Sequence, residues 1–112
     1  MHRDHPLFRD HQKDGWFNGD GSCTCGGPGC DWDTHRLDCW FTNYLPDVNY
    51  QSWDALNAMI EDAIWWAREL DVDGFRGDAV KHFPEAVSRR LRGRLRDTLE
   101  HGRAGLYYLV GE

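Results

Sequence analysis

Apolar residues in the second half of the chain switch repeatedly between two spacings, and this alternation constrains the fold more than any other feature. Two segments repeat every three or four positions, as in helices with one buried face, and two others are short apolar runs typical of strands. Such alternation predicts an α/β fold with parallel strands joined by a crossover helix. The predicted elements are a helix at 53–70 with Ser52 as N-cap, a strand at 72–77, a helix at 84–101 with Pro84 in its first turn, and a strand at 106–111.

The first part of the chain has no sustained period and contains the turn-rich stretch GDGSCTCGGPGCD. We therefore predict two parts, an irregular cysteine-containing segment at 1–50 and a helix–strand–helix–strand segment at 51–112. Two strands and two helices cannot close a barrel or cover both faces of a sheet. The second segment is therefore predicted to be a slice of a larger α/β domain.

Charge and hydropathy exclude two classes of partner. The formal net charge of −6 argues against nucleic acid, because phosphate binding needs a basic surface. No long apolar run is present, so no membrane span is predicted. The start of the chain lacks the apolar core of a signal peptide.

All four cysteines are clustered, at Cys23, Cys25, Cys30 and Cys39. Two disulfides that staple the glycine-rich loop are the favoured interpretation, and they indicate an oxidising compartment. A structural zinc ion is a weaker alternative, because the paired C-x2-C spacing of common zinc sites is missing. Free thiols are a third possibility.

Charged residues crowd into DGFRGDAVKHF at 73–83, although a core strand needs none. Arg76 and Asp78 are two positions apart and so share one face of the predicted strand. Asp78 ends this strand and Glu112 ends the next, at the edge where α/β enzymes place catalytic groups. Neighbouring strands lie about 4.8 Å apart, which suits the roughly 5–5.5 Å between carboxyls in retaining glycoside hydrolysis.

The flanking groups fit the same chemistry. Arg76 would keep Asp78 ionised, as a nucleophile requires, and a carboxyl beside another negative charge keeps its proton, which suits Glu112 as general acid. Lys81 and His82 would line the cleft and donate hydrogen bonds to sugar hydroxyls. The alternative is a buried structural salt bridge between Arg76 and Asp78.

Three stretches resemble motifs of one enzyme family. Residues 74–82 (GFRGDAVKH) are similar to the fourth-strand motif of the α-amylase superfamily, glycoside hydrolase family 13. Residues 109–112 (LVGE) resemble its fifth-strand motif, and 45–49 (LPDVN) resemble a segment near the end of its domain B. The three occur in the family's order. The resemblance implies a partial (β/α)8 TIM barrel preceded by a domain B-like segment, and a retaining hydrolase of α-1,4-glucosidic bonds in starch-like α-glucan polysaccharides or oligosaccharides.

By this resemblance, Asp78 would be the nucleophile, and Glu112 would be the proton donor and later the base. Arg76 would orient the nucleophile, and Lys81 and His82 would contact the sugar on the leaving-group side.

The resemblance also implies a possible structural calcium ion. In calcium-containing members, the positions of Asp47 and of the backbone carbonyl of His82 help to bind the ion, and oxygen ligands suit calcium. The aromatic residues Trp40, Phe41 and Tyr44 would form a sugar-stacking wall in domain B, with packing inside a small loop domain as the alternative.

The sequence departs from the family pattern in several places. The third- and seventh-strand motifs are absent, and Gly77 stands where the family carries a branched aliphatic residue. The chain alone is therefore expected to be incomplete and inactive, within a secreted or periplasmic parent protein. An α-glucan transferase or isomerase, a non-catalytic carbohydrate-binding or interaction module, and a small cysteine-based metal module stay open as alternatives.

Overall fold

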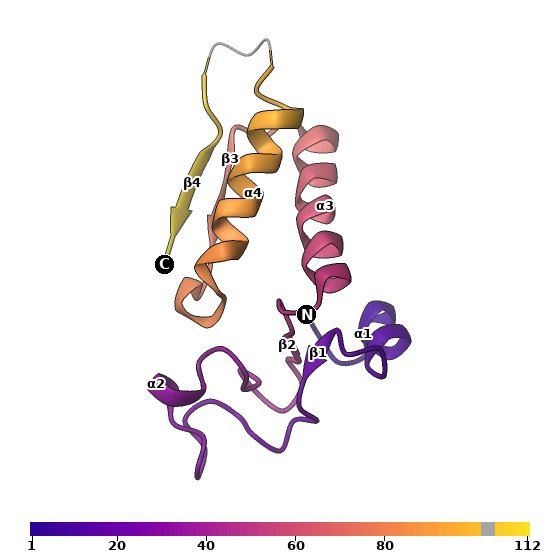
Figure 1. The fold of residues 1–112 in the computed structure, drawn as a ribbon, viewed down its shortest axis with the longest axis vertical. Coiled ribbons are helices and arrows are strands. Elements are labelled where there is room, and N and C mark those ends of the chain that lie inside the picture. The colour runs from indigo at the N-terminus through magenta and orange to yellow at the C-terminus, as the bar shows by residue number, and fades with distance from the viewer. Residues whose placement is uncertain (102–104) are drawn as a thin grey trace. The chain divides into compact units, whose positions relative to one another are not determined.

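The computed structural model describes residues 1–101 and 105–112, and the chain divides into two compact units, 1–55 and 56–112 (Figure 1). The first unit contains α1 (Pro6–His11), β1 (Phe17–Asn18), α2 (Trp32–His35), β2 (Asp47–Val48) and the start of α3 (Trp53–Leu70). The second contains the rest of α3, then β3 (Gly74–Gly77), the 3-10 helix η1 (Val80–His82), α4 (Glu85–Thr98) and β4 (Tyr108–Gly111).

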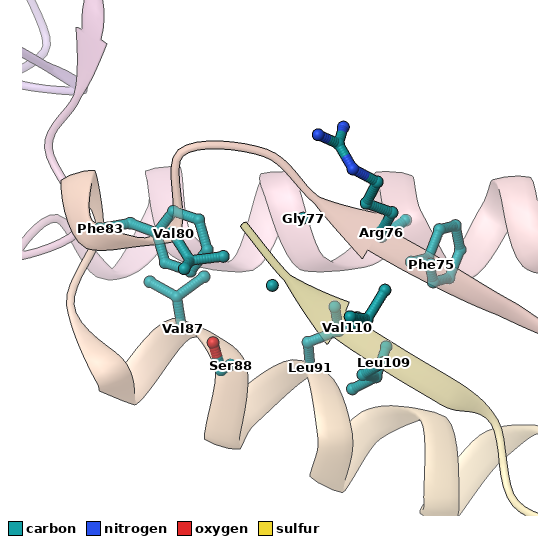
Figure 2. Close-up of a pocket in the computed structure, with 12 residues that line it drawn as sticks. Phe75, Arg76, Gly77, Val80, Phe83, Val87, Ser88, Leu91, Leu109 and Val110 are labelled. Atoms are coloured by element: carbon teal, nitrogen blue, oxygen red, sulfur yellow. The ribbon is translucent and has the colours of Figure 1, made fainter.

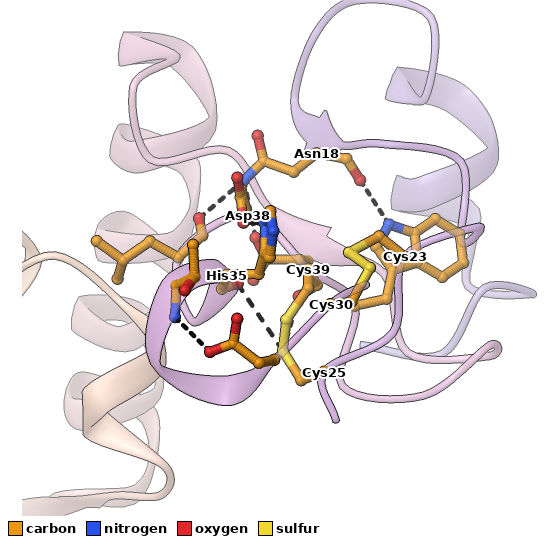
Figure 3. Close-up of a disulfide and its surroundings, with 12 residues drawn as sticks. Asn18, Cys23, Cys25, Cys30, His35, Asp38 and Cys39 are labelled. Atoms are coloured by element: carbon orange, nitrogen blue, oxygen red, sulfur yellow. Dashed lines mark hydrogen bonds and ion pairs between the residues drawn. A yellow bond between two sulfur atoms is a disulfide. The ribbon is translucent and has the colours of Figure 1, made fainter. Parts of the chain in front are cut away.

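The first unit is built around a small aromatic core and two disulfides. Phe8, Phe17 and Trp40 are buried together, with edge-to-face contacts at centroid distances of 4.9 and 5.7 Å. Strands β1 and β2 pair in antiparallel fashion beside this core. The predicted disulfides are present and join Cys23 to Cys30 and Cys25 to Cys39 (Figure 3). The cysteines are therefore not free for zinc.

Helix α3 begins and ends where the sequence predicts. The backbone N–H of Ala55 donates to Ser52 Oγ at 3.4 Å, the hydrogen bond of an N-cap residue. One face is buried through Leu56, Ile60, Ile64 and Ala67. The same spacing predicted a buried Leu70, which is wrong: Leu70 is 61% exposed in the last turn of the helix.

Helix α4 is shorter than predicted, and Pro84 is its N-cap rather than a residue of its first turn. Leu95 is fully buried. The arginines of α4 tie it to α3, which lies beside it in Figure 1. Arg90 Nη2 donates to Asn57 Oδ1 at 2.7 Å, and Arg94 Nε donates to Glu61 Oε1 at 2.7 Å.

Strands β3 and β4 form a parallel pair connected through α4, as the alternation predicts. Gly74 pairs with Tyr108 and Gly77 with Gly111. A Cβ on Gly74 would collide with the carbonyl oxygen of Tyr108, so only glycine allows the strands to approach this closely. The described residues thus form a mixed α/β structure with two small sheets.

None of the described helices is both long and apolar enough to cross a membrane.

Candidate active site

The ends of β3 and β4 bring the two predicted carboxylates to the same edge of the parallel pair. Asp78 and Glu112 each follow one member of the registered pair Gly77–Gly111. The backbone continues the ladder, because the N–H of Glu112 donates to the Gly77 carbonyl at 3.0 Å. The N–H of Val80 then donates to the Glu112 carbonyl at 2.8 Å. The backbone of Glu112 is therefore held on both sides.

Arg76 links both carboxylates. Its Nη2 atom lies 3.3 Å from Asp78 Oδ1 and also forms an ion pair with Glu112 Oε2. The side chains of Arg76, Asp78 and Glu112 are 56%, 79% and 67% exposed. Ion pairs this exposed contribute little to stability. The Arg76–Asp78 ion pair is therefore not the buried structural salt bridge of the alternative prediction. The side chains of Arg76, Asp78 and Glu112 are accessible to a ligand.

The pair between Arg76 and Glu112 was missed in the sequence, although the signal for it is present. Arg76 is registered with Val110, and Glu112 is two residues further along β4. Residues two apart in a strand share a face, so Arg76 and Glu112 are diagonal neighbours. Predicting this ion pair from the sequence would have required the register between β3 and β4.

A tight turn carries the chain from β3 to the residues expected to contact sugar. Ala79 has φ +50°, in the left-handed region that non-glycine residues rarely adopt. This turn starts η1, which holds Lys81 exposed and His82 half-buried. The structure thus places both residues directly after the carboxyl end of β3.

Two glycines make room for η1. A Cβ on Gly77 would lie 3.2 Å from Val80 Cγ1, and a Cβ on Gly111 would lie 2.8 Å from the same atom. Figure 2 shows Val80 beside Phe83 and Val87 at this end of the strands. Gly77 therefore has no side chain to pack on this face of β3, and Val80 of η1 lies there instead.

We expect Gly111→Ala to destabilise the chain by about 1–3 kcal/mol, because the added methyl group would force Val80 and η1 to move. Urea unfolding followed by tryptophan fluorescence measures the loss. Gly93→Ala is the matched control: nothing lies within 4 Å of its Cβ, and alanine in the middle of α4 should stabilise by about 0.5–1 kcal/mol. Equal stability of Gly111→Ala and wild type would contradict the packing role of Val80.

A pocket of about 370 Å³ lies between the strand pair and the helices of the second unit (Figure 2). The guanidinium of Arg76 points away from it. Sugars need polar groups for recognition, so this pocket is not the expected sugar site. Its apolar lining includes Phe75, Val80, Phe83, Leu91 and Leu109.

The predicted aromatic wall divides into core and surface. Trp40 is 3% exposed, and its indole Nε1 donates to the Asn18 carbonyl. It is therefore a core residue in this structure and not an exposed sugar-stacking surface, because it is buried in one cluster with Phe8 and Phe17. Phe41 and Tyr44 are each 47% exposed.

Asp47 of β2 is a half-buried carboxyl that accepts a hydrogen bond from Asn18 Nδ2 at 2.7 Å. Burial raises the pKa of Asp47 to about 7, more than the Asn18 hydrogen bond lowers it. Asp47 belongs to the first unit and His82 to the second. Among the described residues, no cluster of three or more His, Cys, Asp or Glu side chains is arranged to hold a metal ion.

The raised pKa of Asp47 predicts how stability changes with pH in calcium-free buffer. The folded state holds the proton more tightly than the unfolded state, whose carboxyl keeps its ordinary pKa of 3.8. The stability that the Asp47 carboxyl contributes is therefore fully present below about pH 3.8 and is lost as the pH rises through about 7. We expect Asp47→Asn to flatten the fall in unfolding free energy between pH 4 and 7, whereas Asp10→Asn at an exposed position should not. An unchanged slope in Asp47→Asn would contradict this assignment.

No family model matches the chain, but solved structures do. The α-amylase from Geobacillus thermoleovorans, in complex with acarbose, matches 96% of the chain with a TM-score of 0.72 and 25% identity. The α-amylase from Anoxybacillus matches 96% with a TM-score of 0.74 and 24% identity. The chain has an α-amylase-like fold.

This α-amylase-like chain spans 22% of the length of each of these two enzymes. The structural match supports the family resemblance that the motifs around Asp78 and Glu112 indicate.

Proposed function

We propose that the chain is part of a retaining α-glucan hydrolase that cleaves α-1,4-glucosidic bonds in starch-like polysaccharides or oligosaccharides. The observation that carries the proposal is the placement of Asp78 and Glu112 at matched ends of adjacent parallel strands, with Arg76 paired to both. The α-amylase-like fold and the acarbose complex of the Geobacillus enzyme support the choice of a glucan as substrate.

In this proposal, Asp78 attacks the anomeric carbon while Glu112 gives its proton to the departing glycosidic oxygen. The bond from sugar to leaving group breaks as the bond to Asp78 forms. Glu112, now ionised, removes a proton from water, and the resulting hydroxide displaces Asp78 from the sugar. Two inversions at one carbon retain its configuration.

Arg76 acts here as a positioning residue. Its contacts with both carboxylates keep them on one face of the strand pair, where a glycosidic bond can lie between them. Lys81 and His82 follow in η1 and are proposed to bind the sugar on the leaving-group side.

The test is to trap the covalent intermediate with a fluorinated α-glucosyl fluoride, followed by peptide mass mapping. In a protein of α-amylase length that contains these residues, the adduct is expected on Asp78. The same reagent applied to the 112-residue chain is expected to give no adduct. An active enzyme labelled at another carboxylate would overturn the assignment.

We also propose the finer architecture and setting that the family implies. The β3–α4–β4 unit would be one part of a (β/α)8 barrel, supported by the parallel pairing and the crossover helix. Export to an oxidising compartment is supported by the two disulfides.

Calcium binding at Asp47 and the carbonyl of His82 is a further part of the proposal. A half-buried carboxylate oxygen suits a hard cation, which would also favour its ionised form. Calorimetric titration of the α-amylase-length protein with calcium tests this, and heat that persists in Asp47→Asn would remove Asp47 as a ligand.

A further inference from the structure

We propose that Val80 is a positioning residue for Glu112: it holds the strand end that carries the proposed acid at a fixed place beside Asp78. This inference rests on the proposed function, because it concerns the spacing of the two carboxyl groups in that mechanism. Val80 is the first residue of η1. Its side chain carries no polar group, so its effect on the reaction acts through Glu112.

The backbone of Glu112 is hydrogen-bonded on both sides of Asp78. Its N–H donates to the carbonyl of Gly77, the residue before Asp78, at 3.0 Å. Its carbonyl accepts from the N–H of Val80, two residues after Asp78, at 2.8 Å. The segment from Gly77 to Val80 therefore closes a hydrogen-bonded ring with Glu112. The proposed nucleophile and the proposed acid both belong to this ring, which fixes the position of one backbone relative to the other.

A sharp turn at Ala79 brings Val80 to the end of β4. Ala79 has φ +50° and ψ +45°, the left-handed conformation that a residue with a Cβ rarely adopts. Such conformations persist only where the surrounding contacts determine them strongly. Here the contacts are the hydrogen bond to Glu112 and the packing of the Val80 side chain.

The side chain of Val80 lies against the backbone of both strand ends. A Cβ added to Gly111, the residue before Glu112, would meet Val80 Cγ1 at 2.8 Å and Cγ2 at 3.1 Å. A Cβ added to Gly77 would meet Val80 Cγ1 at 3.2 Å. The methyl groups of Val80 thus occupy the space that side chains at the two glycines would take (Figure 2). Val80 therefore sets how closely η1 approaches β3 and β4.

This approach matters because the spacing of the two carboxyl groups decides the course of glycoside hydrolysis. Direct attack by a carboxylate needs a separation of about 5–5.5 Å, whereas about 6.5–9.5 Å admits a water molecule between the groups. Asp78 and Glu112 have side chains that are 79% and 67% exposed, and Arg76, which pairs with both, is 56% exposed. The backbone therefore carries much of the positioning, and a misplacement of about 1 Å can lower a rate by about a hundredfold.

The experiment compares two substrates in a protein of α-amylase length that contains these residues. In Val80→Ala, we expect the turnover of a maltooligosaccharide to fall by at least about tenfold, because a displaced Glu112 protonates the departing oxygen less effectively. The first release of fluoride from α-maltosyl fluoride should fall by less than about threefold, since fluoride leaves without a proton. Val80→Ile should restore the wild-type ratio of the two rates, because it keeps both carbon atoms that face Gly111 and its extra carbon can enter the adjacent pocket.

Gly111→Ala tests the same contact from the other side. Its added methyl group should displace Val80, so the loss should again be larger on the maltooligosaccharide than on the fluoride. Val87→Ala is the matched control, since Val87 lines the same pocket from α4, whereas the atoms nearest to a Cβ on Gly111 all belong to Val80. This control should keep the wild-type ratio of the two rates. Circular dichroism verifies that each variant is folded.

Amide hydrogen exchange in the 112-residue chain separates this inference from the proposed function, because it requires no catalysis. The N–H groups of residue 80 and of Glu112 should exchange at least about tenfold faster in Val80→Ala than in the wild type, and at the wild-type rate in Val87→Ala. Full turnover by Asp78→Asn in the longer protein would refute the mechanism. Faster exchange in Val80→Ala would then still show that Val80 holds the backbone of Glu112.

Two results would overturn the proposal. One is an equal loss on both substrates in Val80→Ala and Gly111→Ala, which would show that Val80 contributes only to folding. The other is exchange of the Glu112 amide at the wild-type rate in Val80→Ala, which would show that the strand end is held without this side chain.

Discussion

Asp78→Asn and Glu112→Gln are each expected to lower the turnover of a maltooligosaccharide by at least about a thousandfold, in a protein of α-amylase length that contains these residues. Asparagine cannot form the glycosyl ester that Asp78 is proposed to form, and glutamine cannot donate the proton proposed for Glu112. Both substitutions keep the size of the side chain. Steady-state rates measure the effect, with Asp97→Asn, an exposed carboxylate on α4, as a control that should keep full activity.

The two variants should differ when the leaving group is changed. Fluoride leaves without a proton, so Glu112→Gln should recover most of its first step on an α-maltosyl fluoride. Asp78→Asn should stay inactive on the same substrate, because the nucleophile is needed whatever group departs. Equal losses on both substrates in Glu112→Gln would contradict its role as acid, and near wild-type turnover by Asp78→Asn would refute the mechanism.

Arg76 explains why the proposed site can exist in this small unit. The proposed nucleophile Asp78 must be ionised, and its pairing with the Arg76 guanidinium favours the ionised form. Because all three side chains are more than half exposed, the arrangement contributes little to folding stability. Its position at the ends of two parallel strands is therefore better explained by chemistry than by packing.

The sequence predicted those features that follow from local periodicity. The 3,4 spacing and Ser52 located α3 at both ends, and the alternation of elements predicted the parallel pair of β3 and β4. Leu70 follows the same spacing but is exposed. The spacing predicts on which face of the helix a residue lies, but not how far along the helix its packing partners extend.

Features that depend on contacts between distant segments could not be predicted in this way. The sequence left open whether Trp40 stacks on sugar or packs inside the loop domain, because its burial depends on Phe8 and Phe17, far away in sequence. The packing of Val80 against Gly77 and Gly111 required the register of two strands joined by a helix. The positions of Asp78 and Glu112 directly after two paired strands could be predicted, because strand alternation and strand ends are local features of the sequence.

Removal of the Cys25–Cys39 disulfide is expected to cost about 3 kcal/mol of stability, as loop closure predicts for a bond that spans 14 residues. Loss of this disulfide should also affect the aromatic core, because the bond lies next to the buried Trp40. The N–H of Cys25 donates to the Trp40 carbonyl at 2.9 Å, and the N–H of Trp40 donates to the Cys23 carbonyl at 3.0 Å. The bond therefore holds the segment that contains Cys39 and Trp40 against the segment that contains Cys23 and Cys25.

Urea unfolding of Cys25→Ala/Cys39→Ala measures this cost, with Cys23→Ala/Cys30→Ala as the matched variant. The second bond closes a loop of only 7 residues, so its loss should cost less. A cost below about 1 kcal/mol would mean that the aromatic core alone holds the loop, and would contradict the stabilising role assigned to this disulfide.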